Sequence, residues 1–371
     1  MGVLAAGVLA YVTGQRGRNL AEAHHQADMD RERERYREDT RREQESDLRD
    51  RYTAIAAQIG HTSAAVRQAG IHALTTLADN WFAFGEIEER QVCISLLQWY
   101  LRVPFPQPSD SVEPDLPERE IRQTIVAIIA ERRQRKQDDP KSWASNVTEL
   151  KQVSLPNCHL SEINLSGIDL YKSNLRGANL FAAELGNAAL MRADLRSTDM
   201  TAAQMKEAVL SKAELTDADL TGADLRRANL SYANLNRAHL PRALLLHAHL
   251  GNADLRSANL RDAHLYGAIV TYADLRDADL TAADLSDADL LSALLIGADL
   301  SLSKLVNANL TGADLTGAKL VRADIRGANL TRANLIDADL TGARTDESTK
   351  WPAGFAPEQL ALETTSMEPR S

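Results

Sequence analysis

An apolar residue recurs at every fifth position of this sequence from Leu155 to Leu340, and no insertion or deletion interrupts the series. Leucine fills almost all of these positions, and the departures are Met200, Met205, Val270 and Ile325. The residue two places earlier is usually Ala, and the residue between them is mostly Asp or Asn, as in Ala218-Asp219-Leu220. A period of five fits neither an α-helix, which repeats at about 3.6 residues, nor a flat strand, which repeats at about 2.0. An unbroken short repeat predicts a solenoid, in which each unit buries its apolar side against its neighbours.

The tandem A-(D/N)-L-x-x pattern resembles the pentapeptide-repeat family and covers about half of the 371 residues. The resemblance implies a right-handed, four-sided parallel β-helix, with one pentapeptide on each side and twenty residues in each coil. Physical reasoning agrees, because Leu220 would stack on Leu240 at the strand spacing of about 4.8 Å, with a small Ala beside each of them. We therefore expect a mainly β solenoid over residues 141–343, preceded by α-helices.

Residues 1–15 are expected to form a partial transmembrane helix or an apolar anchor helix. The run Gly2–Thr13 has no charge, and Arg16 and Arg18 follow it. As a helix it would span about 18 Å, against a hydrocarbon core of about 30 Å, so it is too short to cross alone. We interpret it as the end of a transmembrane helix whose beginning is missing, for instance through a late-assigned start codon; a frayed apolar terminus on a soluble cytoplasmic chain is the alternative. A signal peptide and N-myristoylation fit less well, and the arginines would place the bulk of the chain on the cytoplasmic side.

Residues 16–51 are expected to form a charged helical stalk. Acids and bases alternate at offsets of three and four between Asp28 and Arg51, which supports a solvated helix. Met29, Tyr36 and Leu48 are too sparse for a sustained coiled-coil seam, so a stalk is preferred to a dimerising coiled coil. The sequence leaves the oligomeric state open.

Residues 52–140 are expected to form a small α-helical domain, and Ala64–Leu74 resembles one HEAT-like helix. Apolar residues at helical spacing predict helices that begin near Ile55, Ser63, Glu88 and Glu118. Val92, Leu96, Leu97 and Tyr100 are expected on the packed face of the third helix. Trp81, Phe82 and Phe84 are interpreted as core or linker anchors, with an exposed docking patch as the alternative.

The solenoid needs covers at both ends, because a stack of strands exposes its last rung unless it is capped. Trp143, Val147 and Leu150 are expected to cover the first coil. Residues 344–371 are expected to form a C-terminal cap and a disordered tail, with Trp351 and Phe355 over the final coil. Thr349–Phe355 resembles the closing segment of many pentapeptide-repeat chains.

No motif in the sequence predicts an enzyme, a cofactor or a metal site. Cys93 and Cys158 show no metal or redox spacing and are interpreted as buried small hydrophobes. His239, His249 and His264 fall on different sides of a four-sided coil, so they do not form a ligand cluster. Two carboxylate pairs would stack one coil apart and could bind a cation, but Asp is common at this position, so a solvated face is preferred: Asp199 with Asp219, and Asp279 with Asp299.

Apolar side chains at outward positions form the candidate interaction site. Leu246 and Tyr266 are one coil apart and should touch on one face, next to Leu244. A second group wraps successive faces further along the chain: Leu291, Leu294, Ile296 and Leu302. Apolar residues where the pattern normally places polar ones indicate contact with an unknown protein partner, while drift of the repeat is the alternative.

Two functions remain open. The preferred one is a non-enzymatic scaffold or protein–protein interaction module, a rod tethered to the cytoplasmic face of a membrane through residues 1–15. The alternative, by resemblance to family members that protect gyrase, is a DNA-mimic regulator of a type II topoisomerase. A DNA mimic needs a strongly negative rod, but residues 154–343 hold 23 acidic and 18 basic residues, which favours the scaffold. The net charge of −10 makes nucleic acid an unexpected partner.

Overall fold

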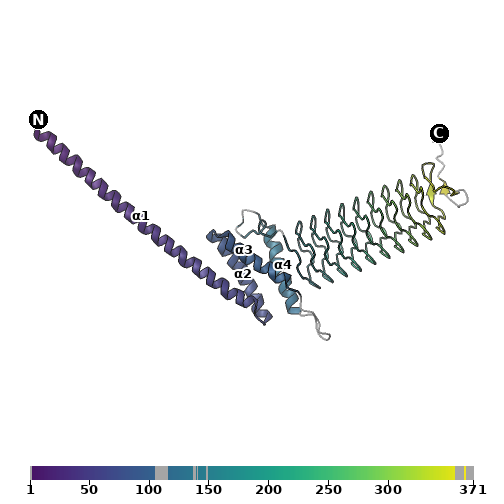
Figure 1. Ribbon diagram of the computed structural model, residues 1–371, viewed down its shortest axis with the longest axis horizontal. Helices are drawn as coiled ribbons and strands as arrows, with labels where there is room; N and C mark the ends of the chain where they lie inside the picture. The colour runs from purple at the N-terminus through teal and green to yellow at the C-terminus, as the bar shows by residue number, and fades with distance from the viewer. Residues whose placement is uncertain are drawn as a thin grey trace. The chain divides into compact units, whose positions relative to one another are not determined.

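The computed structural model describes residues 2–104, 116–136, 139, 141–147, 149–355 and 363–364, with the backbone alone at residues 2–12 and 363–364. The chain divides into two compact units, Met1–Cys93 and Ile94–Ser371. The first unit is helical, and the second contains helices and the solenoid (Figure 1). The boundary between the units lies inside the region 52–140, which the sequence indicates as one helical domain.

Helix α1 (Gly2–Ile59) is a single helix of 58 residues. It joins the expected anchor segment, the charged stalk and the first helix of the helical region without a break. Ion pairs at helical spacing line it, for example Arg31 with Asp28 at 3.3 Å and Arg49 with Glu45 at 2.6 Å. Each pair of this kind stabilises a solvated helix by about 0.2–0.5 kcal/mol. The pairs therefore help to keep the charged segment of α1 helical, although this segment has no apolar face.

The expected anchor, residues 1–15, falls mostly on residues whose side chains are outside the described set. Of the helices in the described part of the chain, none is long and apolar enough to cross a membrane.

Helix α2 (Ala64–Phe84) packs against the C-terminal part of α1. The side chains buried in this unit include Leu48, Ile55, Ile59, Ile71, Leu74, Leu77 and Trp81. The two helices lie close together at Gly70, where a Cβ would lie 3.0 Å from the Cβ of Gln58. Any larger residue at Gly70 would therefore push α1 away from α2.

Of the three aromatic residues at the end of α2, one lies in the core and two lie near the surface. Trp81 is fully buried, as expected of a core residue. Phe82 and Phe84 are half-buried and each lies beneath a guanidinium group, that of Arg90 at 4.3 Å and that of Arg41 at 5.4 Å. Cation–π contacts of this kind hold the two rings without a hydrophobic pocket.

Helices α3 (Ile87–Arg102) and α4 (Leu116–Gln134) lie close to the expected positions. Their buried residues include Ile94, Leu97, Leu101, Ile121, Ile125 and Ile129. One residue of the expected face of α3 was wrong: Val92 is exposed, because the packed stripe is centred on Ile94, Leu97 and Leu101. Cys93 is buried, as expected.

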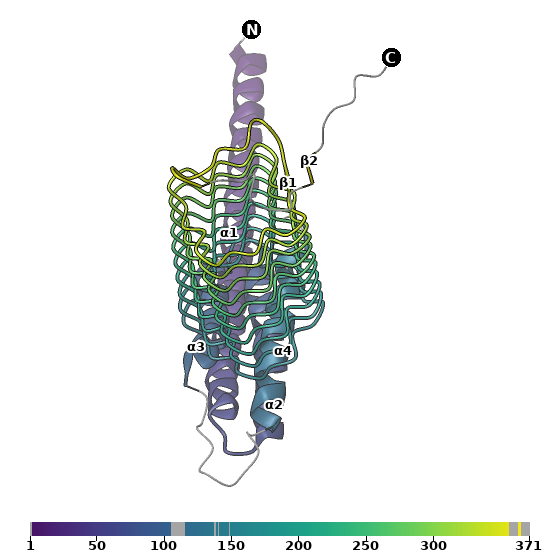
Figure 2. The same ribbon diagram turned by 90° about the vertical axis from the view of Figure 1, so that its right-hand side faces the viewer.

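Parallel bridges join residues twenty apart through the repeat, from Glu149–Asp169 to Asp324–Arg344. Because five residues make one side, a separation of twenty makes four sides, and Figure 2 shows the coils stacked behind one another. The central Leu and the Ala two residues before it are buried along the column, as Leu220 and Ala218 illustrate. The structure confirms the four-sided β-helix and its lumen of Leu and Ala.

Each corner of the coil turns through a residue with a left-handed backbone. The second residue after each central leucine has a positive φ, for example 58° at Asp217 and 64° at Gly222. The N–H of Ala223 then donates to the carbonyl of Leu220 at 3.0 Å, which closes the turn. This conformation costs a residue other than Gly about 1–2 kcal/mol, yet Lys, Arg, Tyr and Ser occupy it as well as Gly. Gly, as in the Thr-Gly pairs, suits this corner position best, but the position is not reserved for Gly.

Buried polar contacts join α4 to the first coil. Arg122 donates through Nη1 to the carbonyl oxygens of Ser154 at 2.7 Å and Val103 at 2.9 Å. Its Nε donates to Glu118 Oε1 at 2.8 Å, and Tyr100 Oη donates to Glu118 Oε2 at 2.7 Å. Arg122 is 1% exposed, so this ion pair is formed away from water.

The segment before the first full coil is also buried. Trp143, Val147 and Leu150 are all inaccessible to solvent. The N–H of Leu150 donates to the carbonyl of Asp169 at 2.6 Å, so Leu150 already occupies the central position of a coil. The solenoid thus begins about one unit before the leucine series at Leu155.

The bridge separation changes at the C-terminal end of the solenoid. Arg344 pairs with Asp324, twenty residues earlier, but Lys350 pairs with Asn329, twenty-one residues earlier. Trp351 therefore holds the place of Leu330 one coil on, and its ring stacks on that of Phe355 at 4.9 Å. Strand β1 (Arg344–Thr345) pairs in parallel with β2 (Glu363–Thr364). The rest of the expected disordered tail lies outside the described residues.

Replacing Arg122 with Leu is expected to lower the free energy of unfolding by about 3–5 kcal/mol, because Glu118 would keep a buried charge without a partner. Replacing both residues with Leu should recover part of this loss. Arg242 is exposed on a corner of the solenoid, and its replacement by Ala should change stability by less than about 0.5 kcal/mol. Denaturant unfolding of the full chain measures all three variants. A loss for Arg122→Leu no larger than for the Arg242 control would contradict the role given to this contact.

Candidate functional site

The residue before each central leucine completes the hydrogen bonding of the solenoid wall. Asp219 Oδ1 accepts the backbone N–H of Thr221 at 2.9 Å, which is an Asx turn. The same bond forms at every Asp or Asn in this position from Asn164 to Asp339. The other four N–H groups of the unit Ala218–Gly222 bond to main-chain carbonyls. An Asp or Asn thus leaves no N–H of its unit unpaired.

The stacked carboxylates of the sequence have this structural role. Asp199, Asp219, Asp279 and Asp299 each accept the N–H two residues later. Asp299 also lies 3.7 Å from the ammonium of Lys319. Over the residues that the structure describes, no group of three or more His, Cys, Asp and Glu side chains is arranged to hold a metal ion.

Arginines two residues after an Asp make a second contact on the walls. Arg226 donates through Nε to Asp224 Oδ1 at 2.8 Å and through Nη2 to Oδ2 at 2.5 Å. The same two-point pairing joins Arg196 to Asp194, Arg256 to Asp254, Arg276 to Asp274 and Arg326 to Asp324. The hydrogen bond from the arginine lowers the pKa of Asp224 below its ordinary value, and the pKa values of Asp254 and Asp324 fall for the same reason. In each of these pairs the arginine therefore balances the negative charge of a carboxylate that stays ionised.

The structure brings Leu246 and Tyr266 to the same corner in consecutive coils. The N–H of His247 donates to the carbonyl of Tyr266 at 3.0 Å, and the two rings meet edge to face at 5.7 Å. Leu244 lies on the side before this corner, where it pairs with Asp224 and His264. Their predicted role in binding a partner stays a prediction.

The second group of candidate residues is spread over several sides of the solenoid. The N–H of Tyr272 donates to the carbonyl of Leu291 at 2.9 Å, which places Leu291 one coil beyond Tyr272. Leu294 and Ile296 flank the buried Leu295 on the next side. Leu302 lies at a further corner and is exposed. These four residues do not gather on one face.

Three more exposed side chains belong with the candidate site and were not singled out from the sequence. Tyr232, Ile269 and Tyr272 are 59%, 37% and 58% exposed. Two signals in the sequence could have found them: the forty-residue spacing of the tyrosines at one corner position, and an Ile where most units have Asp or Asn.

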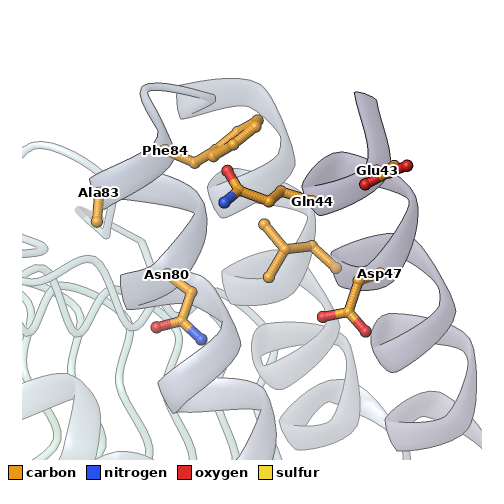
Figure 3. A pocket seen from close by; sticks show the side chains of 7 residues that line it. Glu43, Gln44, Asp47, Asn80, Ala83 and Phe84 are labelled. Carbon is orange, nitrogen blue, oxygen red and sulfur yellow. The ribbon is translucent and has the colours of Figure 1, made fainter. Parts of the chain in front are cut away.

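Among the described residues, the two cysteines and a hollow in the helical unit show no catalytic arrangement. Burial raises the pKa of the Cys93 thiol to about 12 and that of Cys158 to about 12, so both are protonated at neutral pH and are weak nucleophiles. A hollow of about 530 Å³ lies between α1 and α2, and Figure 3 shows the side chains around it. Its lining residues are Glu43, Gln44, Asp47, Leu48, Asn80, Ala83 and Phe84. This lining has no nucleophile paired with a base.

The repeat that forms the walls and the lumen identifies the family of this chain. The family model described as pentapeptide repeats (8 copies) matches in overlapping segments that run from residue 148 to residue 344. The matches cover more than half of the chain, so this chain belongs to the pentapeptide-repeat family, whose fold is a right-handed, four-sided β-helix. A comparison with curated protein sequences finds no match.

Several solved structures of pentapeptide repeat proteins are similar to this chain. HetL from the cyanobacterium Nostoc sp. strain PCC 7120, a pentapeptide repeat protein involved in heterocyst differentiation regulation, is 36% identical, with a TM-score of 0.53 over 56% of this chain and 94% of HetL. A pentapeptide repeat protein from the Arabidopsis thaliana thylakoid lumen is 35% identical, with a TM-score of 0.26 over 26% of this chain and 67% of that one. QnrB1, a plasmid-mediated fluoroquinolone resistance protein, is 17% identical, with a TM-score of 0.31 over 47% of this chain and 89% of QnrB1. The last two superpose too poorly to extend the comparison.

Replacing Asp219 with Ala is expected to lower the free energy of unfolding by about 0.5–1.5 kcal/mol, because the N–H of Thr221 loses its acceptor. Asp219→Asn is the matched control, since an amide oxygen can accept the same bond. Urea unfolding of the two variants and the native chain measures the difference. Equal losses in Asp219→Ala and Asp219→Asn would contradict the Asx assignment.

Acid is expected to weaken the solenoid through its arginine-paired carboxylates. The pKa of Asp224, Asp254 and Asp324 lies below the ordinary value of 3.8 in the folded chain, so their contribution is complete above that value and is lost as the pH falls through the lowered pKa. The melting temperature should therefore begin to drop near about pH 5 and fall further as the pH passes below 3.8 through the lowered pKa values.

The control for this pH dependence replaces the three carboxylates with amides. The variant Asp224→Asn, Asp254→Asn, Asp324→Asn should be less stable at neutral pH and should show a shallower drop in acid, since the titrating groups are gone. An equal acid slope in both chains would show that other groups cause the loss.

Proposed function

We propose that this protein is a non-enzymatic scaffold or protein–protein interaction module. The observation that supports it most is the closed lumen, because Leu and Ala fill it and only the walls offer side chains to another molecule. Exposed apolar residues on these walls, such as Tyr232, Tyr266 and Leu302, are of the kind that forms contact patches between proteins.

The similarity to HetL supports a regulatory form of this role. HetL is involved in the regulation of heterocyst differentiation, and it shares 36% of residues with this chain over the region compared. A regulator that has no catalytic group acts through binding.

The charge pattern supports the interaction role over the DNA-mimic alternative. A mimic of duplex DNA needs rows of carboxylates without counter-charges. In this solenoid, arginines pair with Asp194, Asp224, Asp254, Asp274 and Asp324, and Arg237 pairs with Asp217 at 2.7 Å. Counter-charges therefore lie beside many of the carboxylates of the rod, unlike the uninterrupted negative charge of a DNA surface.

We also propose that residues 1–15 associate with a membrane and that the bulk of the chain lies on its cytoplasmic side. The uncharged run Gly2–Thr13 supports the association, and Arg16 and Arg18 support the orientation. The unbroken helix α1 would lead from this segment into the stalk.

Purification of the tagged full chain from its native cells should recover a protein partner in a fixed ratio. The double change Leu246→Ser, Tyr266→Ser should reduce that recovery by about tenfold or more if this corner is a contact, and Leu294→Ser, Leu302→Ser tests the second group. Arg242→Ala is the control variant. Recovery of no partner in a fixed ratio would contradict the interaction role, and inhibition of gyrase supercoiling by the full chain would favour the DNA-mimic alternative.

The full chain is expected to float with lipid vesicles in a density gradient, because its apolar N-terminal run would enter the bilayer. The change Leu4→Asp, Leu9→Asp should leave the chain at the bottom of the gradient, since charge in this run opposes burial in lipid. Glu22→Gln, which lies beyond the anchor segment, is the control. A native chain that stays at the bottom would show the membrane proposal to be wrong.

A further inference from the structure

One side of the solenoid has no acidic residue over five consecutive coils. We call it the Ile269 wall and define it as the segments 188–192, 208–212, 228–232, 248–252 and 268–272. Their central residues bridge in sequence from Ala189 through Val209, Asn229 and His249 to Ile269. The other three sides carry carboxylates over the same stretch, such as Asp194, Asp219 and Asp224. Asp169 and Asp289 bound the acid-free stretch at its two ends.

The Ile269 wall also has backbone donors without acceptors. Ala, Val, His and Ile replace Asp or Asn at four of its five bridge positions, so the Asx bond is missing there. The N–H groups without a hydrogen bond inside this described stretch are those of Met191, Ser211, Gly251 and Thr271. In the neighbouring unit the equivalent N–H of Ser231 bonds to the outward side chain of Asn229 at 3.0 Å. These four donors therefore lie where an outside acceptor can reach them.

A column of cations runs along one corner of this side of the solenoid, from Lys172 in the segment 168–172, which precedes the wall and also carries Asp169, to Arg192 and Lys212 within the wall. Lys172, Arg192 and Lys212 occupy the same corner position in consecutive coils and are exposed. Within the described part of the chain, none of them forms an ion pair, and the ammonium groups of Lys172 and Lys212 lie 5.3 Å and 5.7 Å from the rings of Tyr171 and Tyr232. Successive coils are about 4.8 Å apart, so the three charges repel one another. An anionic partner would remove this repulsion.

Aromatic and aliphatic side chains lie beyond the cations on the same wall. Tyr232 and Tyr272 share its corner position, and Ile269 lies at the bridge position beside Tyr272. Tyr266 stands at the opposite corner of the same segment of chain, with the ring of His247 against it. Tyrosines give large contact areas at low conformational entropy cost, so this end of the wall suits apolar anchors.

We infer that the Ile269 wall binds an extended peptide segment that carries both acidic and apolar side chains. Its carboxylates would meet Lys172, Arg192 and Lys212 together with the free N–H donors, and its apolar side chains would lie on Tyr232, Ile269 and Tyr272. The assignment rests on the proposed interaction role and adds the site and the chemistry of the partner. Single-stranded nucleic acid fits less well, because the chain has a net charge of −10 and the column on this side holds three cations.

Selection of a phage-displayed library of random peptides on the full chain tests this assignment. Enriched peptides should be acidic with aliphatic or aromatic residues between the acids, and their affinity, measured by fluorescence anisotropy of synthetic copies, should fall as salt rises. The variant Lys172→Glu, Arg192→Glu, Lys212→Glu should weaken binding by about tenfold or more. The variant Tyr232→Ser, Tyr272→Ser should weaken it by a similar factor.

The control Arg242→Glu, Arg322→Glu changes the same corner position on another side and should leave binding unchanged. Circular dichroism of each variant shows whether the coils remain folded; Glu162 and Glu207 already occupy this corner position, so the charge reversals are compatible with it. Peptides without acidic enrichment, no enriched peptide, or full binding by both wall variants would overturn the assignment. Peptides that bind elsewhere on the chain would overturn it while leaving the interaction role intact.

The same variants also distinguish two other occupants of the wall, a second copy of this chain and single-stranded nucleic acid. Concentration-dependent dimerisation that the Lys172→Glu, Arg192→Glu, Lys212→Glu variant abolishes would assign the wall to a second copy of this chain. Binding of a labelled single-stranded oligonucleotide that the same variant abolishes would assign it to nucleic acid. Either result would overturn the assignment to an acidic peptide.

Discussion

The need of each main-chain N–H for an acceptor determines how this solenoid is built. In the unit Ala218–Gly222, four N–H groups find carbonyls within the coil or in the next one, and the fifth depends on the side chain of Asp219. A parallel stack of short sides cannot supply that fifth acceptor from its backbone. The Asp or Asn before the leucine is thus as much a part of the architecture as the leucine, and a wall that lacks it presents unused donors.

The period of five was enough to predict the four-sided coil and its lumen, because only two positions in five can point inward. It did not reveal the Asx turn, since an outward Asp looks like an ordinary solvated residue until its distance to the N–H two residues later is known. The contacts of Arg122 were also hidden. Its acceptors are carbonyl oxygens of Val103 and Ser154, and no sequence pattern marks a carbonyl.

The candidate site was partly visible in the sequence for a related reason. Leu246 and Tyr266 stand out because a separation of twenty places them together, and the structure puts them at one corner. Tyr232, Ile269 and Tyr272 were missed because each looks like an isolated departure along the chain. The absence of acids from five stacked segments becomes visible only when each side is followed from coil to coil.

The extra residue between Arg344 and Lys350 has a consequence for how long such a rod can grow. Up to Arg344 every rung is in phase with the one before, so nothing in the geometry limits the number of coils. After the shift to twenty-one, a further pentapeptide in the original frame would arrive one residue early, with the residue after its leucine where the leucine belongs. A one-residue slip therefore acts as a terminator, and it leaves an incoming strand from another molecule without a matching template for fibre-like extension.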